Sequence, residues 1–149
     1  MSEITVSEIK RDRPEISQGE VVCVVDDDWS VRRSVGRLLE FKGFRVHAFG
    51  EAETFLKHLE TNSVQLVILD IWMETMTGME LLAHLCARSP QTRVIFITGH
   101  EDAAAAATVM SAGASAFLIK PLDPDQLLTA VHRALGHPAP ERKIDRATV

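Results

Sequence analysis

The sequence has few cysteines, no long apolar run and no excess of basic residues, and each of these absences narrows the class of protein. Its 149 residues include two cysteines, Cys23 and Cys86, and neither belongs to a CxxC or CxxH motif. We therefore expect both to be free thiols, buried or half-buried, in a reducing compartment. No apolar stretch reaches the length of a membrane span.

The N-terminus and the charge balance exclude further classes. The first 15 residues, MSEITVSEIKRDRPE, lack the apolar core of a secretory signal. We therefore expect a cytoplasmic protein without a membrane anchor. The formal net charge is −5 and the pI is about 5.6, whereas nucleic-acid surfaces are usually basic, so we expect no direct nucleic-acid binding by this chain.

The chain divides into one regular segment and two irregular ends. Residues 1–19 are polar and charged and are predicted to form a flexible leader, and residues 137–149 contain two prolines and are predicted to form a short tail. Residues 20–136 have the length and the apolar content of a single globular domain.

Within that domain, five short segments have the pattern of strands. Four are continuous apolar runs, as in strands buried on both faces, and one alternates apolar and polar residues, as in an edge strand. The predicted strands are 21–25, 44–49, 66–69, 94–97 and 116–119.

Helical patterns separate the strands. Apolar residues recur three and four positions apart in four of them, and a run of alanines forms the other. The predicted helices lie within 31–39, 52–59, 79–86, 103–110 and 124–135. Regular alternation of strand and helix predicts an α/β fold in which helices cover both faces of a parallel sheet.

Polar residues lie where the predicted strands end. The triplet 26–28 is three aspartates, Asp70 follows the third strand, Thr98 the fourth and Lys120 the fifth. The carboxyl ends of parallel strands share one edge of the sheet, so we expect these side chains in one pocket. Taken singly, each has a simpler interpretation as a helix cap or a solvated side chain.

Together, these residue types favour phosphoryl transfer. Crowded carboxylates need a compensating charge, and a divalent cation such as Mg²⁺ or Mn²⁺ is the simplest source. A lysine suits a phosphate as a point charge, and an aspartate can itself be the nucleophile. The predicted pocket therefore fits an aspartate that accepts a phosphoryl group beside a metal ion.

Five motifs in this order resemble the receiver domain of bacterial two-component response regulators. They are VVDDD at 24–28, LVILDIWM at 66–73, the glycine at 78, VIFITGH at 94–100 and AGASAFLIKP at 112–121. The TGH triplet is most similar to the nitrogen-fixation-regulator branch. The resemblance implies a flavodoxin-like (βα)5 fold of three layers, with strand order 2-1-3-4-5.

The resemblance also implies roles for individual residues. Asp70 is expected to be the phosphoacceptor, Asp26 and Asp27 the acidic pair, and the backbone carbonyl of Trp72 a further metal ligand beside Asp70. Glu74 departs from the family pattern, which usually has a proline there, and Leu122 replaces the usual phenylalanine. We further expect the bulky Trp72 to shield the phosphoryl group and slow its loss.

Three more residues are assigned to the switch by the same resemblance. Thr98 and Lys120 are expected to contact the phosphoryl group, and Phe117 to turn inward on activation. The surface formed by the fourth helix, the fifth strand and the fifth helix is then expected to bind a downstream protein or a second copy of the chain. The phosphoryl donor would be a sensor histidine kinase or a histidine phosphotransfer protein.

Four functions remain open at this point. The leading one is a single-domain response regulator or phosphorelay intermediate, which is not an enzyme with turnover. A second is the regulatory half of a DNA-binding transcription factor, which the sequence as given disfavours because the 13 residues after Gly136 are too few for a helix-turn-helix, so that the factor would have to be truncated. A third is a phosphatase-like hydrolase with an aspartate nucleophile, and a fourth is a receiver-like module that is never phosphorylated.

Overall fold

A computed structural model describes residues 19–99 and 103–138. Its centre is a five-stranded, fully parallel sheet with strand order β2-β1-β3-β4-β5. The strands are β1 (Val21–Val25), β2 (Arg45–Phe49), β3 (Leu66–Asp70), β4 (Arg93–Thr98) and β5 (Ala116–Ile119). The predicted α/β class, strand order and half-exposed edge strand are therefore confirmed, because β2 lies at one edge of the sheet.

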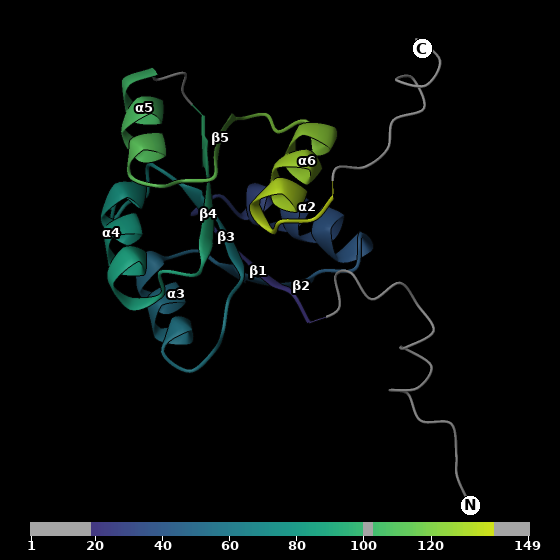
Figure 1. Cartoon of the computed structure of the whole chain (residues 1–149), viewed down its shortest axis with the longest axis horizontal. Helices are drawn as coiled ribbons and strands as arrows, with labels where there is room; N and C mark the ends of the chain where they lie inside the picture. The colour runs from purple at the N-terminus through teal and green to yellow at the C-terminus, as the bar shows by residue number, and fades with distance from the viewer. Residues whose placement is uncertain (1–18, 100–102, 139–149) are drawn as a thin grey trace, which may run out of the picture.

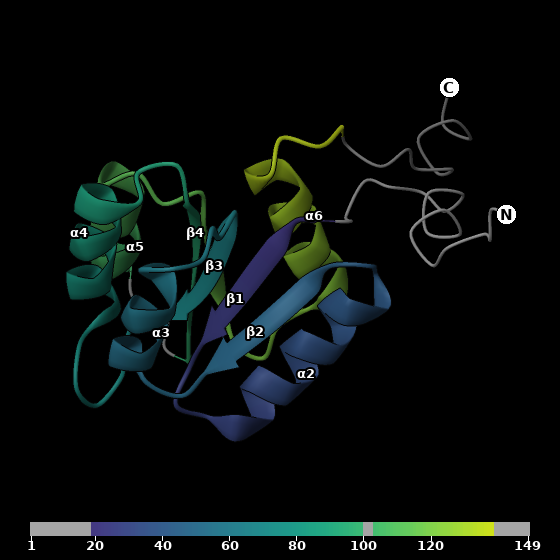
Figure 2. The ribbon, with the colours of Figure 1, turned by 90° about the horizontal axis from the view of Figure 1, so that it is seen from below.

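Five helices cover the two faces of the sheet. They are α2 (Trp29–Phe41), α3 (Ala52–Leu59), α4 (Gly78–Arg88), α5 (Ala103–Ser111) and α6 (Pro124–Ala134). Helices α3, α4 and α5 lie on one face, and α2 and α6 lie on the other (Figures 1 and 2). The molecule therefore has the three predicted layers. None of the described helices is long and apolar enough to cross a membrane.

The two faces of the sheet contribute to two separate apolar cores because successive strand residues point in opposite directions. In β1, Cys23 and Val25 pack with Phe55 on the α3–α5 side, whereas Val22 and Val24 pack on the α2–α6 side. All five β1 residues are buried, as the continuous apolar run predicts. Burial of each large apolar side chain contributes roughly 1.5–3 kcal/mol.

Side-chain caps fix several helix starts. Asp123 accepts hydrogen bonds from the amides of Asp125 and Gln126, and Pro124 occupies the first turn of α6, as the sequence predicts. Helix α4 begins with a capping box between Thr77 and Glu80, in which each side chain binds the other residue's backbone amide.

The structure also corrects two details and leaves a third untested. Cys86 is exposed on α4, so the prediction that both thiols are at least half-buried is wrong for this residue, whereas Cys23 is buried. Asp70 and Thr98 are the last residues of their strands instead of the residues that follow them. The predicted leader at 1–19 and tail at 137–149 lie largely outside the described residues, and those boundaries stay predictions.

Candidate functional site

Three strand ends bring two aspartates and a lysine into contact at one edge of the sheet. Asp26 directly follows β1, Asp70 ends β3 and Lys120 directly follows β5. Lys120 Nζ lies 2.9 Å from Asp26 Oδ2 and 3.3 Å from Asp70 Oδ2. Asp26 is fully buried and Asp70 nearly so, with 6% of its surface exposed. The predicted convergence of these residues on one edge is therefore present in the structure.

A third carboxylate completes a cluster that we call the acidic rim, formed by Asp26, Asp27 and Asp70. One oxygen from each residue lies within 4.8 Å of the other two, and Asp27 is exposed whereas its two neighbours are buried. The buried Asp26 Oδ2 is ion-paired with Lys120 Nζ at 2.9 Å, so this one lysine is shared between Asp26 and Asp70. Three carboxylate oxygens facing one point and short of positive charge fit a divalent cation.

The electrostatics of the rim follow from burial and from like charge. Burial raises the pKa of Asp70 above its usual value, and the neighbouring Asp26 raises it further. Lys120 and the backbone amide of Trp72, which donates to Asp70 Oδ1 at 3.2 Å, oppose that rise. Burial by itself would lower the pKa of Lys120, but Asp26 and Asp70 outweigh it and raise that pKa, so Lys120 stays charged.

The loop after β1 is held by backbone contacts that the sequence did not reveal. Arg32 Nη1 donates to the carbonyl of Asp26 at 2.7 Å, and the amide of Asp28 donates to Asp26 Oδ1 at 2.8 Å. The expectation that Asp28 shares the pocket is wrong, because Asp28 is not part of the carboxylate cluster. It caps α2 by accepting from the amide of Ser30. Only this cap has a sequence signal, an aspartate before a helical pattern.

Gly78 allows α4 to pack tightly against the end of β3. A Cβ atom at this position would lie 2.8 Å from the backbone oxygen of Asp70 and 2.8 Å from the Cα of Ile71. The amide of Gly78 also donates to the carbonyl of Ile71 at 2.7 Å. A residue with any side chain would therefore displace the backbone that carries Asp70.

The remaining predicted residues surround the rim. Thr98 is fully buried at the end of β4, and its carbonyl accepts from the amide of Lys120 at 2.7 Å. Phe117 in β5 is half-buried against the core on the α3–α5 side. Trp72 follows Asp70 by two residues and is 47% exposed. The structure thus gives each residue a place near the rim or its neighbouring face, whereas the predicted roles stay predictions.

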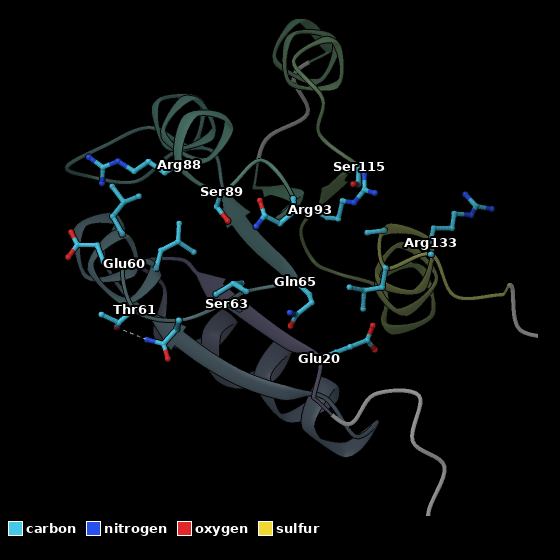
Figure 3. Close-up of a pocket in the computed structure, with 18 residues that line it drawn as sticks. Glu20, Glu60, Thr61, Ser63, Gln65, Arg88, Ser89, Arg93, Ser115 and Arg133 are labelled. Atoms are coloured by element: carbon cyan, nitrogen blue, oxygen red, sulfur yellow. Dashed lines mark hydrogen bonds between the residues drawn. The ribbon is translucent and has the colours of Figure 1, made fainter.

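A second concave region, of about 1000 Å³, lies at the opposite end of the strands. It is lined by residues that precede strands, such as Glu20 and Gln65, by Arg93 at the start of β4, and by the end of α6. Its arginines do not converge, because Arg88 and Arg133 point outward in opposite directions (Figure 3). The acidic rim is therefore the stronger candidate for the functional site.

The fold and the rim together define the class of the protein, a doubly wound α/β domain with an acidic site at the carboxyl ends of its strands. The chain belongs to the response regulator receiver domain family, whose model matches residues 22–132.

Curated relatives support the same family and indicate a branch. The chain is 34% identical over 122 residues to the transcriptional regulatory protein FixJ of Bradyrhizobium diazoefficiens and 36% identical over 126 residues to FixJ of Azorhizobium caulinodans. These matches cover 82% and 85% of the chain but 60% of each relative, so the chain spans about three fifths of their length. The predicted nitrogen-fixation-regulator branch agrees with these matches.

Solved structures agree with the sequence relatives. A receiver domain from Methanospirillum hungatei superposes with a TM-score of 0.74 at 30% identity, over 78% of this chain and 94% of that one. The BeF3-activated DrrB receiver domain superposes with a TM-score of 0.72 at 30% identity, over 79% of this chain and 98% of that one. The chain is therefore a receiver domain of the two-component response regulators.

Proposed function

We propose that this receiver accepts a phosphoryl group on Asp70 with Mg²⁺ bound at the acidic rim. The observation that carries the proposal is the pairing of Lys120 with both Asp26 and Asp70 inside a cluster of three carboxylates. A half-buried lysine beside a carboxylate nucleophile supplies the positive charge that an incoming phosphoryl group needs.

The transfer step uses the carboxylate of Asp70 as the nucleophile. One of its oxygens attacks the phosphorus of a phosphohistidine on a sensor kinase or a phosphotransfer protein. The new P–O bond forms as the P–N bond breaks, and the electron pair of that bond stays on the imidazole nitrogen. Lys120 is positioned to hold the phosphoryl oxygens, and Thr98 supplies a hydroxyl at the adjoining strand end.

Asp26, Asp27 and Asp70 would hold the metal, together with the backbone carbonyl of Trp72. Mg²⁺ or Mn²⁺, when bound, neutralises the negative charge that gathers around the phosphoryl group. The difference in exposure among the carboxylates suits this arrangement. Asp27 is exposed, so the site would be open to solvent, whereas backbone amides hold the carboxylates of Asp26 and Asp70.

The output of the switch would be a change on the face formed by α5, β5 and α6. A phosphoryl dianion on Asp70 would draw Thr98 and Lys120 toward it, and Phe117 would follow into the space behind Thr98. Met110 and Ile119 are large apolar side chains exposed on this face, at 45% and 42%. A downstream protein or a second copy of the chain would bind there.

We further infer that the chain acts as a cytoplasmic signalling domain without catalytic turnover.

Two relatives that it matches are named transcriptional regulators, and a third is the DNA-binding transcriptional regulator NtrC of Proteus hauseri, of which the chain covers 24%. This favours, as a second candidate, the regulatory half of a DNA-binding protein. Trp72, exposed beside Asp70, would shield the phosphoryl group in either case and prolong its lifetime.

Intact-mass measurement after incubation with acetyl phosphate and Mg²⁺ tests the proposal. We expect the wild type to gain the mass of one phosphoryl group and Asp70→Asn to gain none, because an amide is not a nucleophile of comparable strength. Omission of Mg²⁺ should also abolish the gain.

The matched control is Asp28→Asn. Asp28 is the nearest aspartate outside the rim, and asparagine is an equally good N-cap for α2. This variant should be phosphorylated like the wild type. A wild-type protein that stays unmodified by acetyl phosphate and by candidate kinases, or an Asp70→Asn variant that is still modified, would refute the proposal.

A further inference from the structure

Two histidines and a glutamate form a hydrogen-bonded chain at the end of the sheet opposite the acidic rim. Nδ1 of His132 lies 2.9 Å from Nδ1 of His137, and Nε2 of His137 lies 2.9 Å from Oε2 of Glu20. Glu20 precedes β1, His132 is on α6 and His137 follows that helix. We call these three residues the basal cluster.

The basal cluster is partly closed off from solvent. The side chains of His137 and Glu20 are 13% and 22% exposed. Buried Phe44 lies against both rings, with its plane nearly parallel to that of His137 at 6.5 Å and tilted against His132 at 5.8 Å. Because the cluster is shielded from water, its hydrogen bonds are stronger than they would be in water. They therefore have more influence on which ring nitrogens carry protons.

The short distance between the two Nδ1 atoms requires one proton between them. A neutral imidazole has one N–H donor and one acceptor nitrogen, and an imidazolium has two donors. Two arrangements of protons on His132 and His137 satisfy both hydrogen bonds. In one, neutral His132 donates to neutral His137, which donates to Glu20. In the other, His137 is an imidazolium that donates to His132 and to Glu20.

A second proton is incompatible with this geometry. If His132 and His137 are both imidazolium ions, two N–H donors and two positive charges face each other across 2.9 Å. Among the charged groups described around the cluster, Lys42 at the end of α2 adds positive charge, whereas Arg133 points away from Glu20 (Figure 3). Burial lowers the pKa of His132, and His137 and Lys42 lower it further against an opposing contribution from Glu20.

We propose that Glu20, His132 and His137 are a proton-binding clasp that holds the chain where it leaves α6 and opens when a second proton binds. The clasp joins Glu20, which directly precedes β1, to His137, three residues after the end of α6. These two residues are 117 positions apart in the sequence. The amide of His137 also donates to the carbonyl of His132 at 2.9 Å, so the backbone after α6 is fixed by the same pair.

The direction of the pH response follows from the pairing. In the closed clasp His132 stays neutral, because its Nδ1 shares one proton with Nδ1 of His137. A released His132 instead takes up a proton at its ordinary pKa of about 6.5. Lower pH therefore favours the open form, and the clasp loses stability as the pH falls below that value. The described turn from the end of α6 to His137 would then be released in mildly acidic solution, without any phosphoryl group or metal.

Hydrogen exchange at the amide of His137, measured by NMR on the full chain without Mg²⁺ or acetyl phosphate, tests the clasp. After correction for the intrinsic exchange rate, we expect protection to fall at least about tenfold between pH 7.5 and pH 5. Imidazole ¹⁵N shifts at the higher pH should show the proton on Nδ1 of His132. These measurements are independent of the proposed phosphorylation.

Two variants distinguish the clasp from a general loss of structure. Asparagine in His132→Asn offers a donor and an acceptor but takes up no proton, so protection at His137 should become nearly independent of pH. His132→Phe offers neither and should leave the amide poorly protected at both pH values.

The matched control is His58→Asn, which alters a second pair of histidine rings, His47 and His58, 5.0 Å apart on β2 and α3. This variant should keep the wild-type pH dependence at His137. The clasp is refuted if wild-type protection is equal at both pH values, if His132→Asn retains the wild-type response, or if His58→Asn abolishes it.

Discussion

The two ends of the sheet each gather charged or titratable side chains, but the two clusters differ in how many carboxylates they hold and in how much positive charge they can take up. The acidic rim places three carboxylates around one lysine, and burial together with like charge raises the pKa of Asp70. The basal cluster places two imidazoles on one carboxylate, and burial together with the neighbouring ring of His137 lowers the pKa of His132. A buried cluster that lacks one kind of charge selects the ion that supplies it. The rim therefore suits a divalent metal, whereas the base suits a single proton.

The largest expected effect concerns the backbone under the rim. Gly78→Ala places a Cβ atom 2.8 Å from two backbone atoms of the β3 end, so either α4 or the strand end must move. We expect a loss of about 1–3 kcal/mol in the free energy of unfolding, measured by urea denaturation, and weaker phosphorylation of Asp70.

Gly36→Ala is the matched control for this substitution. A Cβ atom at Gly36 would meet only Cγ1 of Val46, at an ordinary 3.7 Å, and alanine favours a helix by about 0.8–1.0 kcal/mol over glycine. This variant should be as stable as the wild type or more so. Equal stability of Gly78→Ala and Gly36→Ala would show that the rim does not depend on this close approach.

A smaller effect tests the charge deficit of the rim itself. Because the folded state raises the pKa of Asp70, its ionised form costs stability at neutral pH, and this cost disappears when the carboxyl is protonated in both states. Without Mg²⁺, Asp70→Asn should therefore be more stable than the wild type near pH 7, by on the order of 1 kcal/mol.

The stability gained in Asp70→Asn should depend on pH. The difference between Asp70→Asn and the wild type should shrink in melts near pH 4, close to the ordinary aspartate pKa of about 3.9. Saturating Mg²⁺ should shrink it at neutral pH as well, because the ion removes the repulsion. A variant less stable than the wild type at neutral pH would show that Lys120 already balances the rim.

The smallest expected effect is the coupling between the two ends. Mg²⁺ should raise the melting temperature of the wild type and of Glu20→Gln by the same amount, and it should not raise that of Asp27→Asn, which loses the exposed carboxylate. Because the two sites share no contact, the stability changes of Glu20→Gln and Asp27→Asn should add within about 0.3–0.5 kcal/mol in the double variant. A larger coupling would join the two ends into one switch.

The sequence by itself determined the order of the elements and the layers, and it placed most of the rim correctly, although it also put Asp28 in the pocket. Apolar runs and helical periodicity are local signals that the sequence contains in full. The rule that parallel strands have their carboxyl ends at one edge of the sheet was enough to predict that Asp26, Asp70 and Lys120 lie together. The helix cap at Asp123 was equally local. The exposure of Cys86 was predicted wrongly, because the pattern of α4 does not fix which side of the apolar stripe a small residue occupies.

Only the tertiary structure decided which atoms meet. Lys120 contacts Asp70 from 50 positions away, and Glu20 contacts His137 from 117 positions away, so no local pattern encodes either pair. His132 and His137 are five positions apart, a spacing that does not bring two side chains together on a helix. They meet because the chain turns back at Gly136, where the amide of His137 donates to the carbonyl of His132. Packing of distant segments, which sets burial and distance together, turned a group of polar residues into two clusters with different charge deficits.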